Sequence, residues 1–536
     1  MDTELLQRTQ LFSCWLCLGG LAVWAAVRLG ERLRRKPWPR LAEPLGVVLA
    51  ALALRCLFAP FAPIHENAHG YEFLGTVFSL QGSFYHGAGF YAFHHPFTLL
   101  FGARPESVFG VNLALSALSA LLLLRLSRRL GLPPGAGLAA AVAWSAWPAA
   151  VRSAGSECFF PLSVCACLVS LLTWLAAWER GRVLDFVAAA LAAAFAMQTR
   201  PELVLWPVLL SLAWLARPGW SRVLRTPGPY LALGLFLLLT AGWLGGRLQA
   251  WSLEGLPQPV RLGLPRTLEA FFSSDHVLLN PAWTSPLLPA LALAGVIGLG
   301  LERWRMAAIL LGGYLLFSIP VVGVGSGLAS DLRLQQLAAP FAFLLAGAGL
   351  AFLADRFGPR ARYPAKVGLL VALTLSSLVL VGKAATDFAP QREYRFLQRA
   401  VPRLPQECEL VVADRFMARR RVSAEFPAFW LPRARLVEVS QLLEEGSGPA
   451  AGCRLFYRGL ACATFLSDEE APQVGIRPEC RRLEERYRLE PWLEERIPGI
   501  TDASFLLLPP DGVTLGFYRL SPRGMSAELN PGGPVR

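Results

Sequence analysis

Charged residues are scarce in this sequence. Only 17% of the 536 residues are Asp, Glu, Lys or Arg, whereas 54% are hydrophobic, and the mean hydropathy is +0.44. A soluble domain carries about 25% charged residues. The deficit excludes an ordinary soluble domain and indicates a chain that crosses a membrane several times.

Lysine is nearly absent. The chain has only Lys36, Lys366 and Lys383, so its net charge of +13 comes from arginine. The arginines stand in short clusters between apolar runs, which is typical of a membrane protein oriented by its loops. We therefore expect no nucleic-acid partner. The arginine bias, with abundant Ala, Gly and Pro, is typical of a GC-rich bacterial genome.

A cleavable secretory signal is also lacking. The first ten residues are slightly acidic, and no small-residue cleavage site follows them. We interpret the first apolar run as a retained span, and eleven more runs are long enough to cross about 30 Å of hydrocarbon. The twelve predicted spans are 11–29, 43–62, 106–124, 136–150, 158–178, 184–198, 202–216, 230–246, 285–301, 306–322, 334–353 and 365–382.

Arginine clusters follow every second predicted span. They come after the first, third, fifth, seventh, ninth and eleventh spans. Basic connections stay in the cytoplasm, so both termini are predicted outside. The outer connections are then 63–105, 151–157, 199–201, 247–284 and 323–333, followed by the tail.

Histidine is rare as well, and its placement is one-sided. All six histidines fall in the predicted outer connections, together with most acids of the membrane part. We therefore expect any chemistry to face outward, at the bacterial periplasm. The histidines are His65, His69, His86, His94, His95 and His276.

The tail differs in composition from the rest of the chain. After a transmembrane domain at 1–386, residues 387–536 alternate short apolar runs with amphipathic stretches, which predicts a small extracytoplasmic α/β domain. The expected helices are 392–404 and 477–492, and the expected strands are 408–414, 435–440, 454–459, 504–508 and 514–520.

Four of the ten cysteines lie in this tail. No close C-x-x-C pair is present, so disulfides are favoured over a zinc site. Of the three possible pairings, we expect Cys462 with Cys480 and Cys408 with Cys453. The other six cysteines lie in or beside spans and are interpreted as small apolar packing residues.

Three features of the membrane part carry a resemblance. They are an acid just after the second span in a long outer loop, "TRPELVLWP" at 199–207, and "DLRLQQLAAPFAFLLAG" at 331–347. Over residues 43–385 the chain resembles the GT-C class of membrane glycosyltransferases, especially bacterial relatives of dolichyl-phosphate-mannose protein mannosyltransferases and aminoarabinose transferases. Two departures are His65-Glu66-Asn67 in place of paired acids, and one additional span at the start.

The resemblance implies a polyprenyl-phosphate-linked sugar as donor and an acid of the first outer loop as base or as the group that orients the acceptor. Sugar transfer needs a base for the acceptor proton and cations for the leaving phosphate. The alternatives are a helix-capping acid, arginines that snorkel to headgroups, and aromatic side chains that only pack. The candidate residues are Glu66 as base, Arg200 and Arg333 on phosphate, and Arg152, Glu157, His65 and Tyr71 as further substrate contacts.

A divalent metal is a further hypothesis. His65 and His69 are four residues apart and would share one face of a helix, where Glu66 or Glu72 would complete a ligand set. The candidate ligands are His69, His95 and His276, and the alternative is that these are hydrogen-bonded loop histidines.

The predicted function is transfer of a sugar from a polyprenyl-phosphate carrier to a glycan, lipid or protein acceptor at the periplasmic face of the bacterial inner membrane. A transporter or flippase for a lipid-linked anion is the first alternative, and charged residues in the middle of spans would favour it. A non-catalytic membrane scaffold that presents the tail is the second. No internal repeat relates the two halves, as many transporters would require.

Overall fold

The computed structural model forms two compact units. The first comprises Met1–Phe61 and Thr76–Thr386, and the second comprises Ala62–Gly75 and Asp387–Arg536. The start of the long outer loop thus groups with the tail. The structure describes residues 3–523 except 34–41, 65–68, 82–83, 85–86, 216–222, 255–268, 270, 273–275, 323–333, 385–388, 406, 414–435, 445–452, 467–471, 475 and 498–510.

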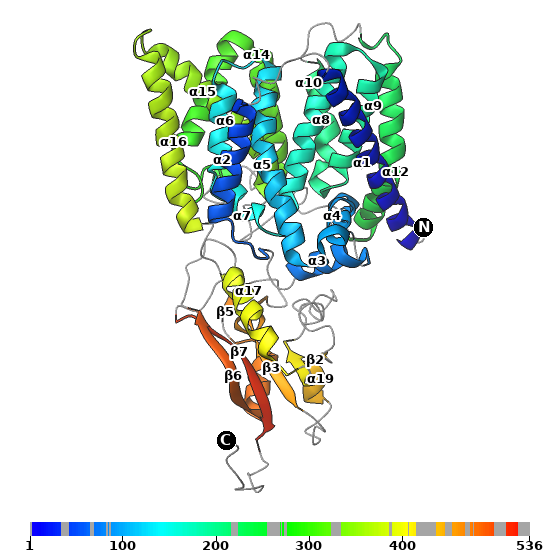
Figure 1. Ribbon diagram of the computed structural model, residues 1–536, viewed down its shortest axis with the longest axis vertical. Coiled ribbons are helices and arrows are strands. Elements are labelled where there is room, and N and C mark those ends of the chain that lie inside the picture. Colours follow the sequence, from blue (N-terminus) through cyan, green and yellow to red (C-terminus); the bar gives the residue numbers. More distant parts are fainter. Residues whose placement is uncertain are drawn as a thin grey trace. The chain divides into compact units, whose positions relative to one another are not determined.

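The first unit is a bundle of helices (Figure 1). Long apolar runs favour helices here because every backbone polar group is then satisfied within its own segment. The described helices of the unit and the one that leads into it are α1 (Thr3–Leu33), α2 (Ala42–Phe58), α3 (His69–Ser79), α4 (Ala88–Phe101), α5 (Pro105–Leu130), α6 (Ala136–Ser145), α7 (Pro148–Ala154), α8 (Phe160–Arg180), α9 (Val183–Met197), η2 (Pro201–Leu205), α10 (Trp206–Leu215), α12 (Gly228–Glu254), α14 (Leu287–Val322), η3 (Leu334–Leu337), α15 (Ala339–Arg356) and α16 (Arg362–Ala384).

Among the described residues, seven helices are long and apolar enough to cross a membrane. This supports a multi-pass helical membrane protein. Each predicted span overlaps a helix, but 285–301 and 306–322 fall within the single helical run α14, which is interrupted at Arg303. The count of twelve spans stays a prediction, because α2, α6, α9 and α10 have 17 residues or fewer.

The predicted span 136–150 is broken in the structure. Helix α6 ends at Ser145, and Pro148 starts α7 after two residues. Proline is tolerated at the first position of a helix and disfavoured inside one. The fully buried Arg55 of α2 lies against this break, where its Nη1 donates to the carbonyl of Ser145 at 3.3 Å and its Nε donates to the Ser116 hydroxyl at 2.7 Å.

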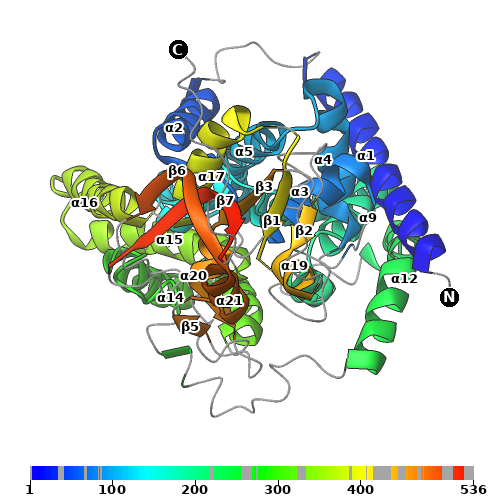
Figure 2. The same cartoon turned by 90° about the horizontal axis from the view of Figure 1, so that it is seen from below.

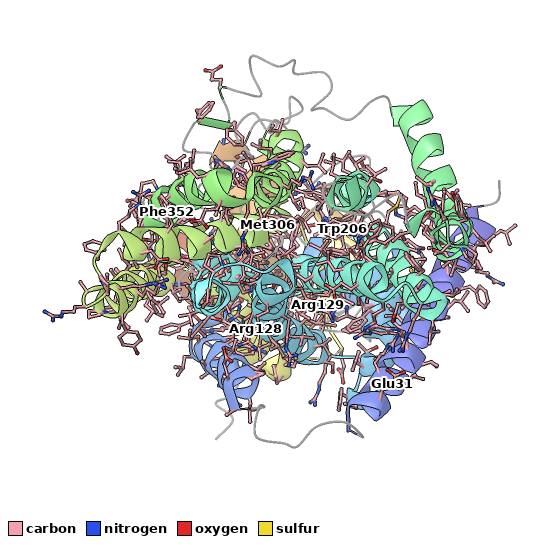
Figure 3. The ribbon with its side chains drawn as sticks, turned by 90° about the horizontal axis from the view of Figure 1, so that it is seen from above. Glu31, Arg128, Arg129, Trp206, Met306 and Phe352 are labelled. Carbon is pink, nitrogen blue, oxygen red and sulfur yellow. A yellow bond between two sulfur atoms is a disulfide. The ribbon has the colours of Figure 1, made fainter. Side chains whose placement is uncertain are left out.

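Several of the predicted basic connections meet at one end of the bundle. Figure 3 looks onto this end and labels Glu31, Arg128, Arg129 and Met306. The contacts there join four of the six basic connections, as expected if they share one side of the membrane. They are the ion pairs Arg28–Asp185, Arg128–Glu43, Arg129–Glu179 and Arg182–Glu31, and a hydrogen bond from Arg303 to the carbonyl of Gly131.

The second unit contains a five-stranded sheet in the order β2-β1-β3-β7-β6 (Figure 2). Strands β2, β1 and β3 are parallel, and β7 is antiparallel to both β3 and β6. The elements are α17 (Ala389–Ala400), η4 (Val401–Arg403), β1 (Glu409–Val412), β2 (Leu436–Glu438), α19 (Val439–Glu444), β3 (Arg454–Arg458), α20 (Leu460–Ala463), β4 (Thr464–Leu466), β5 (Pro472–Val474), α21 (Pro478–Arg486), β6 (Tyr487–Ile497) and β7 (Val513–Pro522), with β4 and β5 paired separately.

Apolar side chains cover both faces of this sheet. Alternate strand residues point to opposite faces, so Leu410 joins a cluster with Phe396 of α17 while Val411 joins one with Leu483 of α21. Both expected disulfides are present, and they lie in different clusters: Cys408 is in the first, and Cys462 and Cys480 are in the second.

The helix expected over 477–492 is wrong in its second half. Helix α21 ends at Arg486, and Tyr487 starts the edge strand β6. Pro491 lies within that strand, beside a register shift at Pro491/Leu493. Proline breaks a helix interior but is accepted in an edge strand or at a bulge. The expected strand 504–508 lies outside the described residues.

Candidate active site

Arg200 and Glu202 form the charged centre of the candidate site. Nε of Arg200 donates to Oε2 of Glu202 at 3.0 Å, and Nη2 donates to Oε1 at 2.8 Å. The guanidinium is buried, and it lies 4.7 Å from the ring centre of Phe160 and 5.7 Å from that of Phe159. Its fork is therefore oriented from one edge by the carboxylate and from one face by the two rings.

Helix α4 from the first outer connection packs against this centre. The backbone N–H of Gly89 donates to the carbonyl of Gln198 at 2.9 Å. Gly87 has φ +111°, and a Cβ there would lie 2.3 Å from the same carbonyl oxygen, so glycine is required. The rings of Phe90 and Phe159 are 4.2 Å apart. The first, second and third outer connections thus share one packed region.

His94 of α4 and Asn112 of α5 organise the loop that carries Glu157. The amide nitrogen of Asn112 donates to the carbonyls of Ser156 and Cys158 at 2.7 and 2.9 Å, and its Oδ1 lies 3.0 Å from Nε2 of His94. All of these groups are buried. Burial lowers the pKa of His94 to about 4, so the imidazole is neutral at pH 7 and orients the loop rather than carrying charge.

Arg152 connects the second outer connection to the fourth. Its guanidinium lies 5.3 Å from the ring centre of Trp283, and the side chain is buried. The neighbouring Ser153 hydroxyl donates to Oε1 of Gln336 at 2.9 Å. Gln336 lies three positions after Arg333, which is outside the described residues, as are Glu66 and His65. Arg152 thus lies beside Trp283, and Glu157 lies two positions before Phe159, whose ring contacts Arg200. That these residues contact the substrate stays a prediction.

His276 lies within the same network. Its Nε2 is 2.7 Å from the hydroxyl of Tyr314, and its ring stacks on Phe271 at 4.6 Å. The next N–H, that of Val277, donates to Oε1 of Gln335 at 2.7 Å. Burial lowers the pKa of His276 to about 4. This histidine is therefore neutral. Its ring is held against Tyr314 of α14, and the backbone of Val277 joins the fourth connection to Gln335 of η3.

Within the part of the chain that the structure describes, the candidate metal ligands are not brought together. No group of three His, Cys, Asp or Glu side chains there is placed to hold an ion. His95 instead pairs its Nδ1 with the carbonyl of Val77 at 2.8 Å, and the partner of His276 is a tyrosine hydroxyl. The side chain of His69 lies outside the described residues.

Tyr71 belongs to the second unit and not to the bundle. It is buried and interacts electrostatically with Tyr457 of β3. The Tyr457 hydroxyl donates to Oε1 of Glu393 at 2.7 Å, and the backbone N–H of Leu460 donates to the same oxygen at 2.9 Å. Burial raises the pKa of Glu393. Tyr71 therefore packs beside the tail sheet, two positions after His69.

The sequence reasoning missed three polar groups with distant partners: the buried Arg55 and Asn112, and the half-buried Glu393. Arg55 interrupts an otherwise apolar run, and a charge in such a run indicates a buried polar contact. Asn112 is a lone amide in a span, where polar side chains find partners on neighbouring helices. Glu393 gave no signal, because acids in amphipathic helices are mostly exposed.

Comparisons with known proteins agree with this architecture. A family model described as "Dolichyl-phosphate-mannose-protein mannosyltransferase" matches residues 86–245. A solved structure of ArnT from Cupriavidus metallidurans bound to undecaprenyl phosphate is 12% identical, with TM-score 0.53, and the match covers 90% of this chain and 98% of that chain. The apo structure of the same enzyme is 13% identical, with TM-score 0.52, and the match covers 89% and 97%.

No curated protein matches the sequence. At 12–13% identity the structural likeness shows a shared fold. The family model adds a similarity in sequence, over the 160 residues from 86 to 245, which run from α4 into α12. The resemblance to GT-C class membrane glycosyltransferases is thereby confirmed.

Proposed function

We propose that this protein transfers a sugar from a polyprenyl-phosphate carrier to a glycan, lipid or protein acceptor at the periplasmic face of a bacterial inner membrane. The observation that carries the proposal is the convergence of outer connections. Segments around His94, Arg152, Arg200 and His276 come from four different outer connections, and contacts link them to one another and to Gln335 of η3. A scaffold would not need this buried polar assembly.

In this proposal Arg200 binds the phosphate of the donor. Two of its five N–H groups are directed to Glu202, so the remaining edge of the guanidinium can bind a phosphate oxygen. ArnT, which shares the fold, was solved with undecaprenyl phosphate bound. In this proposal Arg333 and Arg152 add positive charge, and Glu66 takes the proton from the acceptor hydroxyl as the sugar leaves its carrier.

The tail domain supports the periplasmic assignment. It contains two disulfides, Cys408–Cys453 and Cys462–Cys480. Disulfides persist in the bacterial periplasm and are rare in the cytosol. Together with the basic clusters at the opposite ends of the spans, they favour a tail outside the cytoplasm, where it would help to recognise the acceptor.

The decisive experiment is a transfer assay with the purified full chain. Radiolabelled undecaprenyl-phosphate sugars, hexosyl and pentosyl, are supplied with a periplasmic extract as acceptor source, with and without a chelator. We expect one donor to be consumed, and Glu66→Gln to lower turnover by at least tenfold. Consumption of no donor would refute the enzyme. Unchanged turnover of Glu66→Gln would refute only the choice of base.

One observation favours the transporter alternative. Arg55 is a charged residue inside a span, and intramembrane charges often mark a transport path. However, its Nε and Nη1 are directed to Ser116 and to the carbonyls of Ala51 and Ser145, and Nη2 alone has no partner within the described residues. Those contacts satisfy a helix terminus at the α6/α7 break. We therefore assign Arg55 to the architecture and keep the enzyme as the conclusion.

A further inference from the structure

A pocket opens at the basic end of the bundle, among helices α5, α8, α10 and α14. Its volume is about 690 Å³, within the range of small-molecule sites. None of its lining residues belongs to the candidate active site. They include Leu171 and Leu175 of α8 and Glu302, Arg303, Trp304 and Arg305 of α14.

The interruption of α14 builds the rim of this pocket. At Arg303 the backbone leaves the helical conformation, with φ −146° and ψ 56°. Four consecutive side chains, Glu302 to Arg305, are therefore exposed at the rim. Arg303 is fastened there by its hydrogen bond to the carbonyl of Gly131, at the end of α5. Figure 3 looks onto this end of the bundle and labels Met306 and Arg129.

The charges of the rim are only partly paired. Glu179 is matched by Arg129, and Arg303 donates to a neutral carbonyl. Within the described part of the chain, neither Arg305 nor Glu302 makes an ion pair; Arg305 only lies 5.5 Å from the ring centre of Trp304. The rim thus presents an available cation and an available anion three positions apart on one short segment.

The floor of the pocket is apolar. Leu171 and Leu175 of α8, with Ala213 of α10 and Ile309 of α14, line it, and all four are buried. Trp304 is 65% exposed at the rim, and tryptophan concentrates where hydrocarbon meets headgroups. An apolar floor beneath a charged, tryptophan-bearing rim matches a lipid that inserts from the bilayer better than it matches a solute from water.

We propose that this pocket binds a phospholipid whose headgroup carries a phosphate and a primary ammonium, as phosphatidylethanolamine does. Arg303 and Arg305 bind the phosphate, and Glu302 accepts hydrogen bonds from the ammonium. The acyl region contacts the leucine floor. Such a lipid would fill the space between the interrupted part of α14 and helices α5 and α8. The proposal does not depend on the glycosyltransferase assignment.

The test uses the full-length protein, delipidated in detergent and titrated with vesicles of phosphatidylcholine that contain 10% of a probe lipid with brominated chains. Quenching of tryptophan fluorescence and native mass spectrometry report binding. We expect saturable binding of phosphatidylethanolamine at least tenfold tighter than that of brominated phosphatidylcholine or phosphatidylglycerol. The first competitor has an ammonium that cannot donate a hydrogen bond, and the second has no ammonium.

Two pocket variants and one control variant locate the site. Arg305→Ala with Glu302→Gln should weaken binding at least tenfold, whereas Arg128→Ala, an exposed cation at the same end, should leave it unchanged. Met306→Trp fills the pocket without changing charge and should also abolish binding. Equal binding of the three lipids, or unchanged binding in both pocket variants, would overturn the proposal. Because the readout is lipid binding, a negative result leaves the transfer assay unaffected.

Discussion

Arg200 and Glu202 are joined by two hydrogen bonds across a single proline, and the guanidinium lies beside the rings of Phe159 and Phe160. The carboxylate occupies one edge of the guanidinium and so determines where the other edge points. In the proposed function the pair therefore separates two roles: Arg200 would provide the charge for the donor phosphate, and Glu202 would orient the guanidinium.

Substitutions at this pair should affect turnover differently. Arg200→Lys keeps the charge but loses the fork, and charge-assisted hydrogen bonds contribute about 1.5–3 kcal/mol each. We expect kcat/KM for the lipid donor to fall roughly tenfold to hundredfold. Glu202→Gln should have a smaller effect, mainly on kcat, because the arginine remains but is held less firmly.

Steady-state kinetics in detergent micelles would measure both effects. Arg360→Lys is the matched control, since Arg360 is exposed after α15, and it should behave as wild type. If Arg200→Lys retains full kcat/KM, Arg200 does not contact the donor phosphate.

Asn112 tests whether the buried network positions the loop with Glu157. Asn112→Ala leaves two carbonyls and His94 without their partner, and each buried group left unpaired costs about 1–3 kcal/mol. We expect a loss of stability of about 3 kcal/mol and a marked fall in kcat. Thermal unfolding and transfer assays would report these effects. Ser119→Ala is the control, because that buried hydroxyl on the same helix bonds only within its own turn. An Asn112→Ala protein as stable as Ser119→Ala would contradict the network.

How well each part of the fold can be predicted from the sequence depends on whether the interactions that form it are local or distant along the chain. The spans depend on local interactions, because the backbone hydrogen bonds of an apolar run must be made within that run. Each predicted span overlaps a helix. The α6/α7 break was also readable, since Pro148 is a typical first residue of a helix. Both expected disulfides are present, although the sequence alone leaves three pairings open.

The partners of buried polar groups could not be predicted in the same way. His94 was interpreted as an outer-loop residue, but its partner Asn112 lies on another helix, and only packing brings the two together. Tyr71 interacts with Tyr457, almost 400 residues away in the chain, and its expected contact with the substrate stays a prediction. No periodicity in the sequence encodes such pairs.

Glu393 makes the stability of the tail domain depend on pH. Burial raises its pKa above the ordinary value of about 4.3, so the folded domain holds a proton that the unfolded chain has already released. Its contribution to stability is fully present below about pH 4.3 and is lost as the pH rises through the higher, folded pKa.

The neutral isostere should remove this dependence. We expect Glu393→Gln to flatten the stability of the tail domain between pH 4 and 8, and to be neutral or stabilising at pH 8, where the buried carboxylate is most costly. Thermal unfolding of the full chain across this range is the measurement. Glu495→Gln, an exposed residue paired with Arg399, is the control. A Glu393→Gln protein whose pH dependence parallels wild type would show that another group dominates.

Arg55 distinguishes an architectural charge from a transport path. Its guanidinium joins α2 to Ser116 of α5 and to the last carbonyl of α6, and cations are favourable at a helix C-terminus. Arg55→Met keeps the volume but leaves that carbonyl without a donor, so we expect a loss of about 1–3 kcal/mol with near-normal turnover per folded molecule. Arg128→Met at the exposed end of α5 should cost little. The opposite result, full stability with abolished activity or flux, would place Arg55 in a substrate path and favour the transporter.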